Sequence, residues 1–181
     1  MNRLAHNLCY LVGPIDEAKD RGTEWRKDIS EFLWSLSIGV LNPCDKPTNH
    51  NEDKEFIRKL NEYKSNGNYD KVTELVKEII QIDLHMVDLS NFIICYIDKD
   101  IHSCGSYSEL TYATLEHKPC LIYCKQGVSN IPGWLFGLCD HNMFFDNWED
   151  LKAYIEDVAY STKYIEGWKF LDYNKIFNIK K

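Results

Sequence analysis

The positions of two carboxylates, Asp83 and Glu109, suit a nucleophile or a general acid or base. Glu109 lies in the stretch HSCGSYSEL (102–110), which joins an apolar run to a segment with helical character. Backbone N–H groups at a helix start can hold an anion, and the helix dipole keeps an early glutamate ionised, as a nucleophilic carboxylate must be. Asp83 lies late in a predicted helix, where a negative charge opposes the dipole. We therefore expect both side chains to have a function.

The same residues also have a purely structural interpretation. Ser106 and Glu109 match the S-x-x-E capping box, which satisfies N–H groups at a helix start, and Ser103 is an alternative cap. Asp83 and Asp88 could simply be charges on an exposed helix face. The sequence alone leaves both interpretations open.

Apolar runs alternate with helical patterns along the chain. Short apolar runs predict buried strands over residues 7–12, 38–43, 91–97 and 118–124, with an edge strand over 142–146. Helical spacing of apolar residues predicts helices over 23–37, 54–64, 69–88, 106–117 and 147–161, the first of them capped by Thr23. This alternation is typical of an α/β domain with a mainly parallel sheet of about five strands and helices on both faces.

Length and composition favour one globular domain over residues 1–181, with 161–181 as an aromatic C-terminal extension. The formal net charge of -7 argues against a nucleic-acid partner, because such proteins usually carry a basic face. No segment has the pattern of a signal peptide or a membrane span, so we expect a cytoplasmic protein with no membrane partner. The seven cysteines are expected to be reduced.

Cofactor and metal signatures are missing from the sequence. There is neither a G-x-G-x-x-G dinucleotide fingerprint nor a P-loop. Cys120 and Cys124 are four residues apart, and His102 and Cys104 are two apart, so neither pair has the C-x-x-C spacing of a zinc site. We therefore expect no metal and no cofactor.

Three loops should lie at the ligand-binding edge of the predicted sheet. In parallel α/β sheets, ligands bind outside the carboxyl ends of the strands. This rule selects the loops after Val12, Leu41 and Ile97, the last of which contains the HSCGSYSEL stretch. In the first loop, Gly13 and Pro14 permit a tight strand exit and a close backbone approach, although the same pair would also serve in an ordinary turn.

A set of motifs in a fixed order resembles the nucleoside 2-deoxyribosyltransferase family, in which we include the related 2′-deoxynucleoside 5′-phosphate N-hydrolases. The resemblance covers residues 8–125 and is carried by the order and spacing of its parts. The matching motifs are YLVGPI at 10–15, W-R at 25–26, NP at 42–43, D-L-x-x-x-D at 83–88, G-S-x-x-E-L at 105–110 and A-x-x-x-x-K-P at 113–119.

This resemblance implies a flavodoxin-like or Rossmann-like α/β fold and cleavage of the N-glycosidic bond of a 2′-deoxynucleoside. Glu109 would be the nucleophile that forms a deoxyribosyl-enzyme intermediate, Asp83 would handle the leaving base and its proton, and Tyr10 would help to place Glu109. It implies a small-molecule nucleoside or nucleotide partner and a homo-oligomer. The candidate substrate-binding residues are Gly13, Pro14, Ile15, Asp16, Arg26, Asp88, Ser103, Gly105 and Ser106.

The chain departs from the family pattern at Ser103 and Asn91. Members that transfer deoxyribose between free nucleosides usually carry an acid six residues before the nucleophile, where this chain has Ser103. In the related phosphate hydrolases a serine there helps to bind the 5′-phosphate. Ser103 therefore favours a nucleotide substrate and hydrolysis over transfer. Asn91 replaces an acid that is often seen before the apolar strand.

Two alternative functions remain open at the level of the sequence. One is a phosphoribohydrolase-like enzyme that acts on ribonucleoside monophosphates, although the P-G-G-x-G-T run of that class is missing. The other is a non-catalytic nucleotide-sensing module on the same fold. The presence of both Asp83 and Glu109 argues mildly for an enzyme.

Overall fold

The computed structural model describes residues 1–15, 18–45 and 54–172. Its centre is a five-stranded parallel sheet in the order β2-β1-β3-β4-β5. This order is that of flavodoxin-like folds, so the predicted α/β class and the predicted strand number are confirmed. The strands are β1 (Leu8–Val12), β2 (Gly39–Leu41), β3 (Phe92–Ile97), β4 (Cys120–Cys124) and β5 (Phe144–Phe145).

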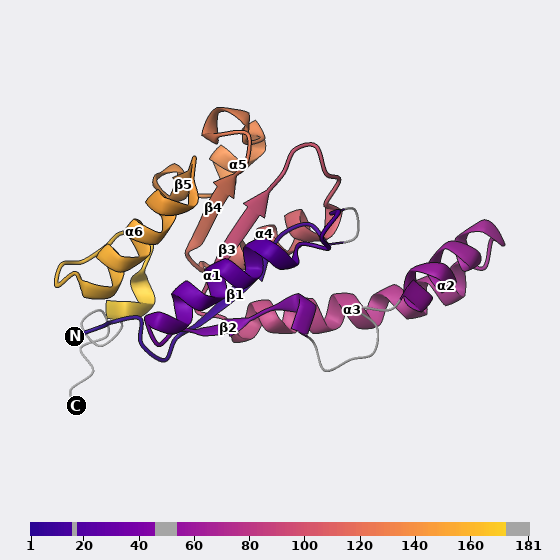
Figure 1. Ribbon diagram of the computed structural model, residues 1–181, viewed down its shortest axis with the longest axis horizontal. Helices are drawn as coiled ribbons and strands as arrows, with labels where there is room; N and C mark the ends of the chain where they lie inside the picture. Colours follow the sequence, from indigo (N-terminus) through magenta and orange to yellow (C-terminus); the bar gives the residue numbers. More distant parts are fainter. Residues whose placement is uncertain (16–17, 46–53, 173–181) are drawn as a thin grey trace.

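Helices cover both faces of the sheet (Figure 1). One face packs against α1 (Thr23–Ser35) and α6 (Trp148–Tyr160). The other packs against α3 (Tyr69–Leu89), α4 (Cys104–Leu115) and α5 (Gly133–Leu138). Single turns of 3-10 helix occur at Pro43–Asp45, Val128–Asn130, His141–Met143 and Lys169–Asp172.

Side chains along β1 alternate between the two faces of the sheet, and this places the Tyr10 hydroxyl on one of them. Cys9 and Leu11 belong to the apolar core under α1 and α6, whereas Tyr10 and Val12 belong to the core under α3 and α4. Strand side chains alternate between faces, so Tyr10 carries a hydroxyl into the α3–α4 side. On the face covered by α1 and α6, four aromatic rings contact one another beside the aliphatic core. They are Trp25, Tyr96, Tyr123 and Trp148.

A helical arm projects from the body of the molecule (Figure 1). It consists of α2 (Lys54–Ser65) and the first part of α3, which pack against each other. Most of the apolar side chains of α3 remain partly exposed, and Val87 near its end is the one fully buried residue of that helix. Among the described residues, no helix is both long and apolar enough to cross a bilayer.

The segment after α6 returns to the body of the protein. Trp168 is fully buried, packs against Phe92 and Phe170, and donates a hydrogen bond from Nε1 to the Tyr154 hydroxyl at 3.0 Å. Asp172 forms an ion pair with Arg3 at 3.1 Å. The described part of the aromatic extension therefore covers the flank of its own domain, while residues 173–181 lie outside the described residues.

Candidate active site

Tyr10 is the centre of a polar group on the α3–α4 side of the sheet. Its side chain is fully buried, and its backbone pairs with Leu41 on one side and Ile93 on the other. Burial raises the pKa of Tyr10 well above its usual value, and the charges of Glu109 and Asp83 raise it further. A side-chain hydrogen bond with Glu109 acts in the same direction, while the positive charge of Arg26 opposes it. These four side chains therefore lie within electrostatic reach of one another.

Asp83 and Glu109 reach this group from two helices that pack together. Asp83 lies six residues before the end of α3, and Glu109 is the sixth residue of α4. Both side chains are half-buried, and one carboxylate oxygen of Asp83 is buried. The Tyr10 hydroxyl is buried and makes no hydrogen bond within 3.5 Å among the described residues.

Arg26 is fully buried and holds the loop between β1 and α1. Its Nη2 donates to the Gly13 carbonyl at 2.8 Å, and its Nη1 donates to the carbonyls of Gly22 at 2.8 Å and Pro14 at 3.4 Å. Burial lowers the pKa of Arg26, while the charges of Cys44, Tyr10 and Glu109 oppose that shift. Arg26 therefore orders the loop through the N–H groups of its guanidinium, and its positive charge acts on Tyr10.

Gly22 leaves room for the hydrogen bonds of Arg26, and Gly13 leaves room for the ring of Trp25. Gly22 has a φ of +69°, and a Cβ there would overlap Arg26 Nη1 and the Pro14 carbonyl oxygen. A Cβ on Gly13 would lie 2.8 Å from a ring carbon of Trp25. The close backbone approach predicted for Gly13 is therefore an approach to the ring of Trp25. Within the same loop Pro14 is buried and Ile15 is half-buried, while Asp16 lies outside the described residues.

The N-cap of α1 is Gly22, not the predicted Thr23, and the side chain of Asp20 binds N–H groups at this helix start. Its carboxylate accepts hydrogen bonds from the N–H groups of Gly22 at 3.1 Å and Glu24 at 3.0 Å. Partial burial would raise the pKa of Asp20, but these backbone bonds and the charge of Arg26 outweigh it and lower the pKa. The prediction of Thr23 as cap is wrong because the helix already begins at Thr23, whose hydroxyl donates to the Asp20 carbonyl.

The start of α4 lies two residues earlier than the sequence suggested. The helix begins at Cys104 and its N-cap is Ser103, which makes no side-chain capping bond. Ser106 and Glu109 are thus inside the helix, and the capping-box interpretation is wrong, because a capping box requires the serine at the N-cap. Gly105 faces open space, since a Cβ there would meet no atom within 4 Å.

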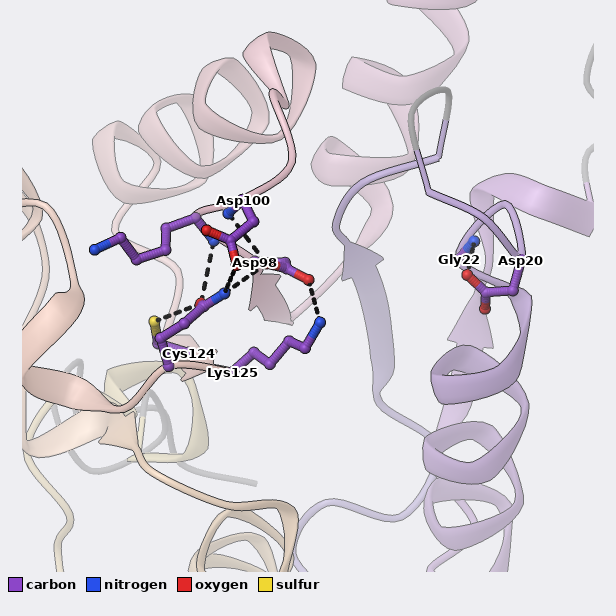
Figure 2. A network of polar contacts seen from close by, with 8 residues as sticks. Asp20, Gly22, Asp98, Asp100, Cys124 and Lys125 are labelled. Carbon is purple, nitrogen blue, oxygen red and sulfur yellow. Dashed lines mark hydrogen bonds and ion pairs between the residues drawn. The ribbon is translucent and has the colours of Figure 1, made fainter.

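A buried carboxylate anchors the base of this second loop (Figure 2). Asp98 directly follows β3 and accepts hydrogen bonds from Lys125 Nζ at 2.7 Å, Gln126 Nε2 at 2.6 Å and the Asp100 N–H at 3.1 Å. Burial would raise the pKa of Asp98, but these hydrogen bonds outweigh it and lower the pKa. The loop after β3 is therefore tied to the loop after β4, while its far end at Ser103 carries no such clamp.

Asp88 stands apart from the group around Tyr10. It accepts a hydrogen bond from the Tyr112 hydroxyl at 2.6 Å, and its carbonyl accepts one from Lys118 Nζ at 3.0 Å. Because α3 ends at Leu89, just before β3 begins, Asp88 lies toward the amino end of that strand. The structure therefore brings together Tyr10, Asp83, Glu109 and Arg26, with Ser103, Gly105 and Ser106 at the start of α4, and leaves Asp88 outside.

Sequence reasoning missed Asp20 and Asp98. Asp98 could have been found from its place directly after a buried strand, where parallel sheets collect functional groups. Asp20 has no comparable signal, because its role depends on the helix beginning at Thr23. The described residues contain no cluster of three or more histidines, cysteines or acids that could hold a metal ion.

Comparison with solved structures agrees with the fold. The 2-deoxyribosyltransferase of Bacillus psychrosaccharolyticus matches with a TM-score of 0.55 at 15% identity, over 82% of this chain and 95% of that chain. A conserved protein from Enterococcus faecalis matches with a TM-score of 0.57 at 16% identity, over 84% of this chain and 99% of that chain. No protein-family model matches the chain, and no curated protein matches it by sequence.

Proposed function

We propose that this chain is an enzyme of the nucleoside 2-deoxyribosyltransferase kind, which cleaves the N-glycosidic bond of a 2′-deoxynucleoside or its 5′-monophosphate. The observation that carries the proposal is the meeting of Tyr10, Asp83 and Glu109 on one side of the sheet. A carboxylate pair beside a phenol suits glycosidic cleavage, in which positive charge develops on the sugar and the leaving base needs a proton. The shared fold of a known 2-deoxyribosyltransferase agrees with it.

Glu109 is the nucleophile in this proposal. Its carboxylate oxygen forms a bond to the anomeric carbon as the bond from that carbon to the base nitrogen breaks, which gives a deoxyribosyl ester. Asp83 supplies the proton to the leaving base. Tyr10 holds Glu109 in position through its hydroxyl, and the buried charge of Arg26 favours the ionised carboxylate.

Water is the proposed acceptor of the sugar, and a 5′-monophosphate is the proposed substrate. The N-cap Ser103 leaves its hydroxyl out of capping, and Gly105 leaves open space beside it. The first N–H groups of a helix have no partner within that helix, and the helix dipole favours an anion there. A phosphate dianion could therefore accept hydrogen bonds from Ser103, Ser106 and the helix start.

We also propose that copies of the chain associate through the region where α3 leaves the body. A hollow of about 680 Å³ lies there between α3 and β2, and its apolar lining residues are Trp34, Val40, Leu41, Ile82, Met86 and Leu89. Trp34, Ile80 and Leu89 are each at least half exposed, and apolar patches of this kind commonly mark protein interfaces. Light scattering of the wild type and of Leu89→Asp should show association in the first and its loss in the second.

Base release measured by chromatography tests the activity directly. A panel of 2′-deoxynucleosides, their 5′-monophosphates and matched ribonucleotides is incubated with the protein, with and without an added free base. Release without exchange indicates a hydrolase, exchange with the added base indicates a transferase, and no release from any member of the panel contradicts the proposal.

The leaving-group role of Asp83 has its own test. Asp83→Asn should lower the rate most for bases that leave poorly, because those bases depend most on protonation. An equal loss for good and poor leaving bases would instead indicate that Asp83 acts in binding or folding. Asp88→Asn is the matched control, since Asp88 lies on the same helix but outside the group around Tyr10.

A further inference from the structure

Two cysteines meet at the amino end of β4, at the opposite end of that strand from the Asp98 network. Cys120 is the first residue of β4, and Cys139 directly follows α5. The sulfur of each lies 3.6 Å from the hydroxyl oxygen of Thr114 on α4. Three separate elements therefore bring two thiols to one hydroxyl group.

Hydrogen bonds around this cluster fix its geometry. The Thr114 hydroxyl donates to the Leu110 carbonyl at 2.9 Å, so its oxygen is left facing both sulfurs. The sulfur of Cys120 also lies 3.2 Å from the Lys118 carbonyl oxygen. The N–H of Cys139 donates to the Leu135 carbonyl at 2.8 Å, which holds Cys139 at the end of α5.

The two thiols differ in exposure and in acidity. Cys120 is buried, whereas Cys139 is half-buried, and both line a cavity of about 180 Å³ that also contacts Lys118 and Lys169. The hydrogen bond between the two side chains lowers the pKa of Cys139 and raises that of Cys120, because a proton left on Cys120 stabilises the thiolate of Cys139. A thiolate that is accessible from a cavity and has a second thiol beside it is the arrangement of oxidation-sensitive cysteines.

We propose that Cys120 and Cys139 form an oxidation site that reacts with a small peroxide to give a disulfide. The Cys139 thiolate attacks one peroxide oxygen, the O–O bond breaks, and the released hydroxide takes up a proton to become water. The Cys120 sulfur, having lost its proton, then attacks the sulfenic sulfur of Cys139 and displaces a second hydroxide. Overall, two thiols and one hydrogen peroxide give one disulfide and two waters.

The other buried cysteines lack this arrangement. Burial raises the pKa of the thiols of Cys9 and Cys95, which disfavours the reactive thiolate. Cys124 lies at the far end of β4 and contacts Gln126 at 3.9 Å. Oxidation should therefore join the end of α5 to the start of β4 and leave the remaining buried cysteines as thiols.

Peptide mapping of peroxide-treated protein tests the proposal. The full chain is treated with hydrogen peroxide at neutral pH, quenched by alkylation, digested without reductant and analysed by mass spectrometry. We expect a cross-linked peptide pair joining Cys120 to Cys139, lighter than the two thiol peptides by two hydrogen atoms and split by reductant. Cys124→Ala, the matched control on the same strand, should give the same cross-link.

Replacing one cysteine at a time separates the oxidation of Cys139 from the formation of the disulfide. Cys120→Ser should allow Cys139 to gain oxygen without forming the cross-link, and Cys139→Ser should leave Cys120 as a thiol at the same peroxide dose. The proposal is overturned if wild-type Cys139 accumulates oxygen without the cross-link, or if both residues remain thiols while exposed Cys104 is oxidised.

Discussion

The loops after β1 and β3 follow neighbouring strands and both lead into helices, yet their polar groups are used in opposite ways. In the first loop, Arg26 donates hydrogen bonds to three backbone carbonyls, and Asp20 accepts hydrogen bonds from two N–H groups at the helix start. In the second, the base is anchored by Asp98, but Ser103 makes no capping bond and Gly105 faces open space. In the described part of the first loop the polar groups bind one another, whereas Ser103 and the N–H groups at the start of α4 are the donors that the proposed phosphate would use.

Under the proposed function, the two loops have different tasks. Groups that already hold one another contribute to stability and shape, so replacing them should lower the free energy of unfolding. Groups that would act on the ligand contribute less to the fold, so replacing them should mainly alter binding or turnover. Four substitutions test this division, and each is paired with a control on the same kind of element.

The largest effect is expected for Glu109→Gln. Loss of the nucleophile should lower the rate of base release by at least about 10³-fold, because the neutral amide can neither attack the sugar nor offset its positive charge. Denaturant unfolding should show a free energy close to that of the wild type. Glu116→Gln at the end of the same helix is the control and should keep the wild-type rate. A Glu109→Gln variant that keeps most of its rate would show that Glu109 is not the nucleophile.

A large loss of stability is expected when the closed loop is opened. Arg26→Met removes the donor from three buried carbonyls, and an unsatisfied buried polar group costs about 1–3 kcal/mol. We expect the free energy of unfolding to fall by about 3 kcal/mol, measured in urea. Lys27→Met, at the next and exposed position of α1, should change it by less than about 0.5 kcal/mol. Equal effects of the two substitutions would mean that Arg26 does not hold the loop.

A smaller effect on specificity is expected for Ser103→Asp. A hydrogen bond to a charged group contributes about 1.5–3 kcal/mol, so the wild type should bind a 5′-monophosphate at least about tenfold more tightly than the nucleoside. Aspartate repels the dianion but is a favourable N-cap residue, so the preference should reverse while the fold is kept. Calorimetric titration with a deoxynucleoside and its 5′-monophosphate measures this preference in both proteins. Ser108→Asp on the same helix is the control, and equal affinity of the wild type for both ligands would favour the transferase.

The smallest effect on stability is expected for Gly105→Ala. The new methyl group meets open space, and alanine favours the helix over glycine by up to about 1 kcal/mol, so stability should be unchanged or slightly higher. The affinity for the monophosphate should fall, because the methyl group would occupy space beside the proposed phosphate site. Gly137→Ala in α5 meets equally open space and should leave affinity unchanged. An unchanged affinity in Gly105→Ala would place the ligand elsewhere.

The sheet could be predicted from the sequence because each strand is a short apolar run between turn signals. The runs over 7–12, 91–97 and 118–124 correspond to β1, β3 and β4 with shifts of one or two residues. The start of α4 was harder to predict, because Gly105 lies inside its first turn and glycine disfavours a helix. That shift placed Ser106 at the cap and suggested a capping box that does not exist.

The site could be predicted only in part, because several of its contacts depend on three-dimensional pairing. The Asp98–Lys125 contact requires β3 and β4 to pair with Ile97 opposite Cys124, a register that no local pattern encodes. The complete burial of Arg26 could not be predicted from the sequence either, since arginine is almost never fully buried unless its charge is satisfied. Asp83 and Glu109 were expected to have a function from their places in the sequence, and the family resemblance added Tyr10 and the role of each residue. Their proximity follows from the packing of α3 and α4 on β1.

Trapping the covalent intermediate tests the central claim most directly. Wild-type protein is mixed with the deoxynucleoside 5′-monophosphate that releases its base fastest, quenched within the first turnovers, digested, and analysed by mass spectrometry. We predict that the peptide containing Glu109 carries the mass of one deoxyribosyl phosphate, and that the adduct is missing from Glu109→Gln. Base release at the wild-type rate with no adduct on Glu109, or an adduct on another residue, would contradict the account.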